Sequence, residues 1–194
     1  ARFESRSYGF RPGRSCQDAM QAIFVTARGA TCKRLWALDA DLAAAFDRID
    51  HAHLLAQLGS FPARGMIAAW LRAGVIDQGR FAPTEAGSPQ GGVISPLLMN
   101  VALHGMEQAA GVRYIRTGTN AGTARSGSPV LIRYADDLLT LCHSREQAQQ
   151  SRRGSRNGCD LGVWSSTRTR PVSCTSMTGW TFWGSTSAAT AASC

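Results

Sequence analysis

Two adjacent carboxylates, Asp136 and Asp137, lie in a short turn between two apolar runs. A second acidic pair, Asp39 and Asp41, follows another apolar run. Ionised groups placed beside core-forming strands are costly unless a positive charge compensates them. Carboxylates from two neighbouring strand ends can hold two Mg²⁺ ions roughly 4 Å apart, which stabilise the attacking and leaving oxygens of a phosphoryl transfer. These residue types therefore point to metal-assisted phosphoryl transfer, the chemistry of polymerases.

The elements that must position these carboxylates follow from caps and apolar periodicity. Ser15 can cap a helix whose first turn carries Asp18, and Asp50 can cap a second helix. Helices mixed with antiparallel strands predict an α+β fold. The predicted elements are helices over 16–29, 51–59, 63–73 and 94–110, a strand over 34–40, a hairpin or loop over 76–92, a Gly- and Ser-rich connection over 117–129 and a hairpin around the acidic turn.

An Asp-Asp pair in a turn is also common as simple solvated turn chemistry, so a further signal is needed. The segment Ser88–Leu97 supplies it: Ser-Pro-Gln-Gly-Gly-Val-Ile-Ser-Pro-Leu, between the two acidic sites. With this segment the chain resembles the reverse transcriptases that bacterial group II introns encode. Three further blocks carry the resemblance in the order that the family keeps: Tyr8–Ser15, Asp39–His51 and Tyr134–Asp137.

The resemblance implies a right-hand polymerase, of which this chain is expected to hold the palm and part of the fingers and to lack the thumb. Asp41, Asp136 and Asp137 match the catalytic carboxylates and would hold two Mg²⁺ ions. Strand periodicity does not separate Asp41 from Asp39. The resemblance does, because Asp41 has the family's spacing to an aromatic residue five positions later. Tyr134 is expected beside the primer end.

The substrate site that the resemblance implies lies around Phe46 and the Gly-rich segment. The Phe46 ring is expected under the incoming sugar, where its bulk excludes a 2′-hydroxyl group; the alternative is a simple core aromatic. Gln90 offers an amide to the nucleotide, and Gly91 lets backbone N–H groups approach it closely. Arg11 and Arg14 are expected to contact template phosphate, with solvated surface arginines as the alternative.

Two stretches depart from the family pattern. Residues 43–45 are alanines where the family usually has Lys and Gly. From Ser151 onward the chain is rich in Ser and Thr and loses periodicity, so residues 1–150 are expected to form a partial reverse transcriptase domain and 151–194 an aberrant, disordered tail. Loss of one nucleotide after the Gln150 codon would explain this, because the neighbouring frame can encode a family-like continuation. The first residue is Ala rather than Met, which suggests a fragment or a reading frame that was assigned without its beginning.

Composition limits the classes of partner and the cellular compartment that fit this chain. The net charge of +8 suits a phosphate-rich partner. The expected partners are an RNA template (the intron RNA), a DNA primer and dNTPs, with no membrane and with the oligomeric state left open. Six cysteines without metal-ligand spacing, no signal peptide and no long apolar run favour the bacterial cytoplasm over secretion or a membrane.

Three hypotheses about function remain. The first is the RNA-directed DNA polymerase of a group II intron, in which a primer 3′-hydroxyl attacks the α-phosphate of a dNTP and releases pyrophosphate. The second is a non-catalytic RNA-binding, maturase-like fragment. The third is the product of a decayed mobile element. The intact acidic blocks favour the first hypothesis for the lineage, while the suspected frameshift and the missing fingers predict a truncated copy that can be inactive by itself.

Overall fold

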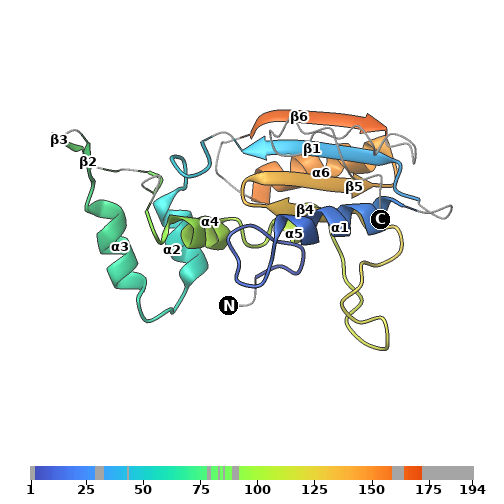
Figure 1. Ribbon diagram of the computed structural model, residues 1–194, viewed down its shortest axis with the longest axis horizontal. Coiled ribbons are helices and arrows are strands. Elements are labelled where there is room, and N and C mark those ends of the chain that lie inside the picture. Colours follow the sequence, from blue (N-terminus) through green and yellow to red (C-terminus); the bar gives the residue numbers. More distant parts are fainter. Residues whose placement is uncertain are drawn as a thin grey trace.

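The computed structural model of the chain describes residues 3–28, 33–42, 44–77, 80–82, 84, 86–88, 92–158 and 164–171. Helices and strands are mixed along these residues, as predicted, in an α+β arrangement (Figure 1). In chain order the elements are α1 (Cys16–Ala27), β1 (Trp36–Leu42), α2 (His51–Leu58), α3 (Arg64–Arg72), β2 (Val75–Asp77), β3 (Arg80–Ala82), α4 (Ser95–Ala102), α5 (Met106–Ala109), β4 (Val130–Tyr134), β5 (Asp137–Cys142), α6 (Arg145–Gly158) and β6 (Trp164–Pro171).

The main sheet has the strand order β4-β5-β1-β6, and all neighbouring strands in it are antiparallel. The central strands β5 and β1 are far apart in the sequence, and they pair from Trp36 opposite Cys142 to Asp41 opposite Asp137. The hairpin of β2 and β3 forms a separate two-stranded sheet beyond α3 (Figure 1). The predicted hairpin around the acidic turn is therefore present as β4 and β5.

Alternate residues of the central strands face opposite sides of the sheet, and each side has its own core. Helix α1 contacts β4 on one side, and α6 contacts β5 and β1 on the other (Figure 1). The core on the α1 side includes Ala19, Ile23, Ala37, Val130, Ile132, Leu139 and Leu141. The core on the other side includes Ala40, Leu42, Leu131 and Leu138, together with residues of α2, α3, α4 and α5.

The predicted helix caps are confirmed at two positions. Ser15 and Asp18 form a reciprocal capping box: the Asp18 N–H donates to Ser15 Oγ (3.2 Å), and the Ser15 N–H donates to Asp18 Oδ2 (2.7 Å). Asp50 accepts a hydrogen bond from the His53 N–H at the start of α2. Helix α2 then ends at Leu58, and its C-cap residue Gly59 has a φ of 54°. Local sequence chemistry thus sets these helix ends.

The predicted helical stretch over 94–110 is divided into two helices. Helix α4 ends at Ala102, and α5 begins at Met106 after Gly105, which has a φ of 96°. Glycine adopts this left-handed conformation without the strain that a Cβ would add. The break redirects the chain, so that α4 packs on α2 while α5 packs on α6.

The tail boundary predicted after Gln150 falls inside a helix. Helix α6 continues to Gly158, and the side chains of Ser151 and Ser155 on it are buried. Strand β6 pairs along β1, an edge that would otherwise leave backbone groups without partners. Helix and strand therefore extend beyond residue 150. The frameshift itself stays a prediction.

None of the helices in the described ranges is both long enough and apolar enough to span a membrane.

Candidate active site

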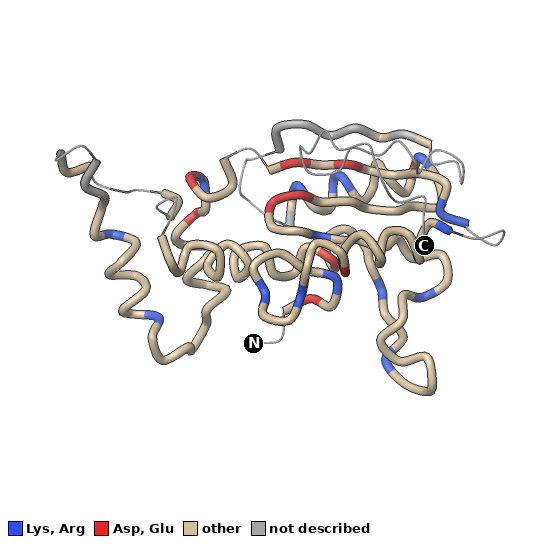
Figure 2. The backbone as a smooth tube through the Cα atoms, viewed as in Figure 1, with Lys and Arg blue, Asp and Glu red and all other residues tan. Residues whose placement is uncertain are grey.

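Asp41 and Asp137 are direct cross-strand partners at one end of the ladder between β1 and β5. Directly opposed residues of an antiparallel pair have their side chains on the same face of the sheet, with Cβ atoms about 5 Å apart. Asp136 precedes Asp137 in the turn between β4 and β5. The fold thus brings the three predicted catalytic carboxylates to one end of the sheet, and Figure 2 shows acidic segments on β1 and on this turn.

Burial and electrostatic repulsion both act on the carboxyl group of Asp137. The pKa of its carboxyl group is raised to about 7, first by burial and then by the negative charges of Asp136, Asp41 and Asp39. Asp39 contributes because it lies two residues before Asp41 and so faces the same side of β1. Concentrated negative charge of this kind favours a bound cation.

The donor set fits Mg²⁺ by its chemistry, because this ion prefers carboxylate oxygens. Within the part of the chain that the structure describes, no three Asp, Glu, His or Cys side chains are arranged to hold one metal ion together. Joint binding by Asp41, Asp136 and Asp137 would therefore require their side chains to rotate toward a common point.

A buried hydrogen-bond network holds the turn that carries Asp136. Ala135 has a φ of 55°, a left-handed conformation that residues other than glycine seldom adopt. Arg133 Nη1 donates to the Ala135 carbonyl oxygen (3.2 Å) and to Asn100 Oδ1 (2.9 Å). Asn100, on α4, donates from Nδ2 to the Gly9 carbonyl oxygen (3.0 Å). The network ties the turn to α4 and to the N-terminal segment.

The N-terminal segment, residues 6–9, lies beside β4. The Tyr8 N–H donates to the Arg133 carbonyl oxygen (2.8 Å), and the Arg133 N–H donates to the Arg6 carbonyl oxygen (2.9 Å). The next residue, Gly9, passes so close to the acidic turn that a Cβ at this position would overlap the Ala135 backbone. A glycine at position 9 therefore allows this close approach.

Arg133 and Asn100 are site-supporting residues that the sequence reasoning missed. Their side chains are only 1% and 0% exposed, respectively. Buried polar groups need hydrogen-bond partners, and the bond from Arg133 to Asn100 supplies one to each residue. A sequence signal existed, because each is a polar residue within an otherwise apolar strand or helix. That signal marks two polar positions in apolar elements, but it does not show that the two side chains form a hydrogen bond with each other.

The predicted sugar-facing residue, Phe46, lies in the loop after β1. Its ring is partly buried against the core and lies edge-on to the Phe10 ring, with ring centroids 6.2 Å apart. The Ser88 N–H donates to the Phe46 carbonyl oxygen (2.7 Å), and the Gly87 N–H donates to the Ile49 carbonyl oxygen (2.8 Å). These bonds fix the beginning of the predicted nucleotide-site segment against the loop after the acidic strand.

Two residues of the predicted nucleotide contact, Gln90 and Gly91, lie outside the described residues. Tyr134, the predicted neighbour of the primer end, is the register partner of Asp137. Its side chain is partly buried and packs against both hydrophobic cores. The tyrosine therefore lies beside the acidic turn.

The two arginines predicted to bind template contact their own segment. Arg11 Nη1 donates to the carbonyl oxygens of Glu4 (2.8 Å) and Ser7 (2.9 Å), and Arg14 Nη1 donates to the Ser5 carbonyl oxygen. An arginine has five N–H donors, so these bonds leave others on each guanidinium. Contact with phosphate stays a prediction for both residues.

Two solved structures with the same fold are telomerases. The telomerase of Candida tropicalis, in its apo form and truncated from the C-terminal domain, aligns with a TM-score of 0.56 and 12% identity, over 86% of this chain and 36% of that one. The Candida albicans telomerase in complex with the TWJ fragment of telomeric RNA aligns with a TM-score of 0.53 and 14% identity, over 87% and 31%. At such identities the likeness concerns the fold.

Sequence relatives come from introns and from a bacterial genome. The group II intron-encoded protein LtrA of Lactococcus lactis subsp. cremoris is 36% identical over 110 residues, which are 55% of this chain and 18% of LtrA. An uncharacterized 91 kDa protein in the cob intron of Schizosaccharomyces pombe is 37% identical over 110 residues (55% and 13%). Protein YkfC of Escherichia coli K12 is 40% identical over 119 residues (58% and 31%). This chain thus spans less than a third of the length of each.

A family model covers a longer part of the chain than these pairwise alignments do. The model described as reverse transcriptase (RNA-dependent DNA polymerase) matches residues 1–158, which include every predicted site residue. With the acidic cluster and the shared fold, this match shows that the chain belongs to the reverse transcriptase family.

Proposed function

We propose that this chain forms the palm of an RNA-directed DNA polymerase of the group II intron type, which adds dNTPs to a primer 3′-hydroxyl on an RNA template. The observation that carries the proposal is the pairing of Asp41 with Asp137 across two strands, with Asp136 beside them. Relatives that include a group II intron-encoded protein support intron RNA as the template. The RNA in the complex of the Candida albicans telomerase supports an RNA partner for this fold.

In the proposed mechanism, Asp41, Asp136 and Asp137 would hold two Mg²⁺ ions. When bound, the ions supply positive charge that stabilises the attacking oxygen and the pyrophosphate leaving group. The chain's own part is to keep the three carboxylates together against their mutual repulsion. The bond from Arg133 to the Ala135 carbonyl oxygen does this for the turn, because supporting hydrogen bonds fix the geometry of site residues.

The substrate contacts of the proposed site involve other residues. Phe46 would lie under the deoxyribose and exclude a 2′-hydroxyl group by its bulk. Gln90 and Gly91 would contact the nucleotide, and Tyr134 would lie beside the primer end. Support for the position of Phe46 comes from its backbone hydrogen bond with Ser88, where the nucleotide-site segment begins. Template phosphate would contact Arg11 and Arg14.

Primer extension tests the proposal. The purified chain is given an RNA template, an annealed DNA primer, dNTPs and Mg²⁺, and RNA binding is measured in parallel. Asp137→Asn should abolish extension and leave RNA binding measurable, whereas the matched control Glu146→Gln, an exposed carboxylate on α6, should extend like the parent chain. Extension by Asp137→Asn at the parent rate would refute the role of Asp137. RNA binding without extension by any form would favour the non-catalytic, maturase-like alternative.

A further inference from the structure

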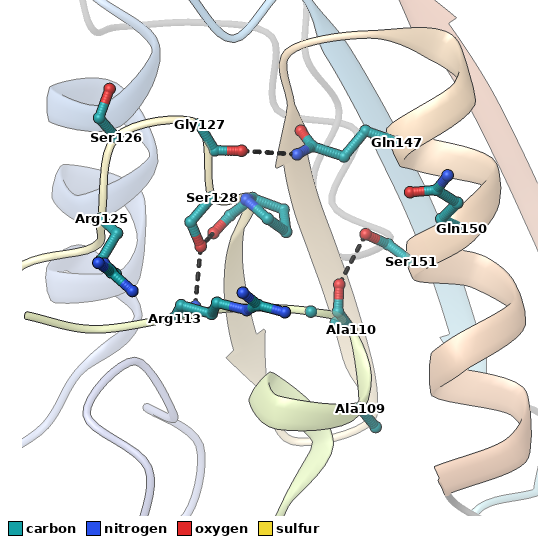
Figure 3. A pocket seen from close by; sticks show the side chains of 12 residues that line it. Ala109, Ala110, Arg113, Arg125, Ser126, Gly127, Ser128, Gln147, Gln150 and Ser151 are labelled. Carbon is teal, nitrogen blue, oxygen red and sulfur yellow. Dashed lines mark hydrogen bonds between the residues drawn. The ribbon is translucent and has the colours of Figure 1, made fainter.

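A polar cavity lies at the end of the β4–β5 hairpin opposite the acidic turn. Its volume is about 490 Å³, within the range of roughly 300–1,000 Å³ that is usual for ligand pockets. One wall is the chain between α5 and β4, and the other is the first half of α6 (Figure 3). Strand β4 has five residues, so at about 3.3 Å per residue the cavity is roughly 15 Å from the turn. It is therefore distinct from the proposed catalytic site.

Hydrogen bonds hold the two walls of the cavity in place. Gln147 Nε2, on α6, donates to the Gly127 carbonyl oxygen (2.7 Å), and Ser151 Oγ donates to the Ala110 carbonyl oxygen (2.7 Å). The side chain of Ser151 is buried. Both bonds join α6 to the connection before β4 (Figure 3). The cavity is thus a fixed feature between two elements that are distant in the sequence.

Backbone pairing brings two arginines, Arg113 and Arg125, to this cavity. The Arg125 N–H donates to the Arg113 carbonyl oxygen (2.8 Å), and the Arg113 N–H donates to Ser128 Oγ (2.8 Å). Both side chains line the cavity and are exposed (Figure 3). These hydrogen bonds use backbone and Ser128 atoms, so they leave both guanidinium groups available to a ligand.

The charge around the cavity is positive. The described residues that line it include no Asp or Glu, and the sequence from Gln108 to Ala135 contains four arginines and no carboxylate. Among the residues that the structure describes, neither Arg113 nor Arg125 forms an ion pair with a carboxylate. Two uncompensated guanidinium groups beside polar amides are suited to phosphate oxygens, which arginine binds through two parallel N–H donors.

We propose that this cavity binds phosphates of the RNA backbone, at a contact separate from the acidic end of the palm. Arg113 and Arg125 bind phosphate oxygens from one wall, and Gln150, on the other wall, offers an exposed amide to a sugar or base edge. The choice of RNA among phosphate-bearing ligands rests on the proposed function. The cavity gives the RNA a second binding site on the chain. The contribution of the cavity to RNA affinity therefore does not depend on catalysis.

A salt titration of RNA binding tests the proposal. Binding of a labelled single-stranded RNA oligonucleotide to the whole chain is measured by fluorescence anisotropy at several salt concentrations. Each phosphate contact contributes roughly 0.7 to the slope of log affinity against log salt for single strands. The double variant Arg113→Gln/Arg125→Gln should therefore lower the slope by about 1.4 more than a substitution outside the cavity does. The variant is expected to fold, because both side chains are exposed.

Arg116→Gln is the matched control, since Arg116 is an exposed arginine of the same connection that does not line the cavity. A slope change in the double variant no larger than in this control would overturn the proposal. A second outcome would also overturn the proposal. NMR would show that inorganic phosphate binds at Gln147 and Gln150, while the salt dependence of RNA binding by the double variant stays at the parent value. The RNA-binding titration contains no dNTP and does not measure primer extension. A failure of primer extension would therefore count against the proposed polymerase activity and would not change the outcome of the titration.

Discussion

Arg133 Nη1 donates a hydrogen bond to the carbonyl oxygen of Ala135, only two residues later, across the beginning of the acidic turn. The same nitrogen donates to Asn100 on α4, and Asn100 donates to Gly9 in the N-terminal segment. A fully buried arginine thus links the backbone of the turn to two other parts of the fold. The link holds the turn that carries Asp136, one of the three carboxylates predicted from the sequence to be catalytic.

Asn100→Ala should destabilise the chain by about 1–3 kcal/mol. The substitution leaves the Gly9 carbonyl oxygen and the Arg133 guanidinium without one buried partner each, and this is the cost of an unsatisfied buried polar group. Urea unfolding followed by circular dichroism measures the change. The control is Asn120→Ala, because Asn120 is exposed in the connection before β4. Equal stability of the two variants would contradict the proposed importance of the network.

Gly9→Ala should cost about 1–3 kcal/mol, because an added Cβ overlaps the Ala135 backbone and the segment must shift. Gly65→Ala is the matched control. Gly65 lies in α3, and a Cβ there meets no atom within 4 Å. The control should gain about 0.5–1 kcal/mol, because alanine is the better helix residue. Thermal unfolding of the two variants should therefore shift in opposite directions, and a shift in the same direction would argue against the close approach.

Mg²⁺ should stabilise the folded chain at neutral pH if the acidic cluster binds it. A ligand that binds only the folded state raises the free energy of unfolding with its concentration. The parent chain and Glu146→Gln should therefore unfold at higher urea concentrations when Mg²⁺ is present. Asp137→Asn should lose most of this gain, because it removes a carboxylate from the cluster. An equal gain in all three forms would mean that Mg²⁺ acts elsewhere.

Glu107 should make the stability of the chain depend on pH. Burial raises the pKa of its carboxyl group and the charge of Glu4 raises it further, against a hydrogen bond from Tyr114 that lowers it. At pH values between the unfolded-state and folded-state pKa of Glu107, its carboxyl group thus keeps a proton in the folded chain that it has lost in the unfolded chain. The stability that Glu107 contributes is highest below the ordinary glutamate pKa of about 4.3 and falls as the pH rises through the higher, folded-state pKa.

Glu107→Gln should flatten this fall, because glutamine is neutral and keeps an acceptor for the Tyr114 hydroxyl group. Urea midpoints measured across the acid range for the variant and the parent chain give the difference. Glu146→Gln is a control that should change the pH dependence of stability in the opposite direction. The pKa of Glu146 is lowered by hydrogen bonds, so its substitution should steepen the fall slightly. Parallel curves for Glu107→Gln and the parent chain would show that the raised pKa has no energetic effect.

The sequence predicts those features that depend on neighbouring residues. Ser15 with Asp18, and Asp50, mark helix starts that the structure confirms, because a cap acts within one helical turn. Apolar runs on both sides of Asp136 and Asp137 likewise predict the hairpin. The resemblance of four ordered blocks then selects Asp41, which periodicity alone does not distinguish from Asp39.

The features that the sequence leaves open depend on contacts between distant segments. Asn100 contacts Gly9 across 91 positions, and no local pattern pairs these residues. Helix α6 continues beyond Gln150, where the buried Ser151 donates to the Ala110 carbonyl oxygen, a contact that a polar, Ser-rich sequence does not indicate. The cavity with Arg113 and Arg125 also forms only when α6 packs against the connection before β4. Tertiary packing therefore decides what local propensity cannot.

Phe46→Val should admit ribonucleotides in primer extension. A smaller side chain under the sugar would leave room for a 2′-hydroxyl group, whereas the partly buried Phe46 ring is held beside Phe10 and the core. The measurement is the ratio of ribonucleotide to deoxyribonucleotide incorporation on one RNA template. Phe24→Val is the control, because Phe24 is an exposed phenylalanine on α1. If Phe46→Val retained extension with the parent ratio, Phe46 would be a core aromatic and sugar selection would lie with other residues.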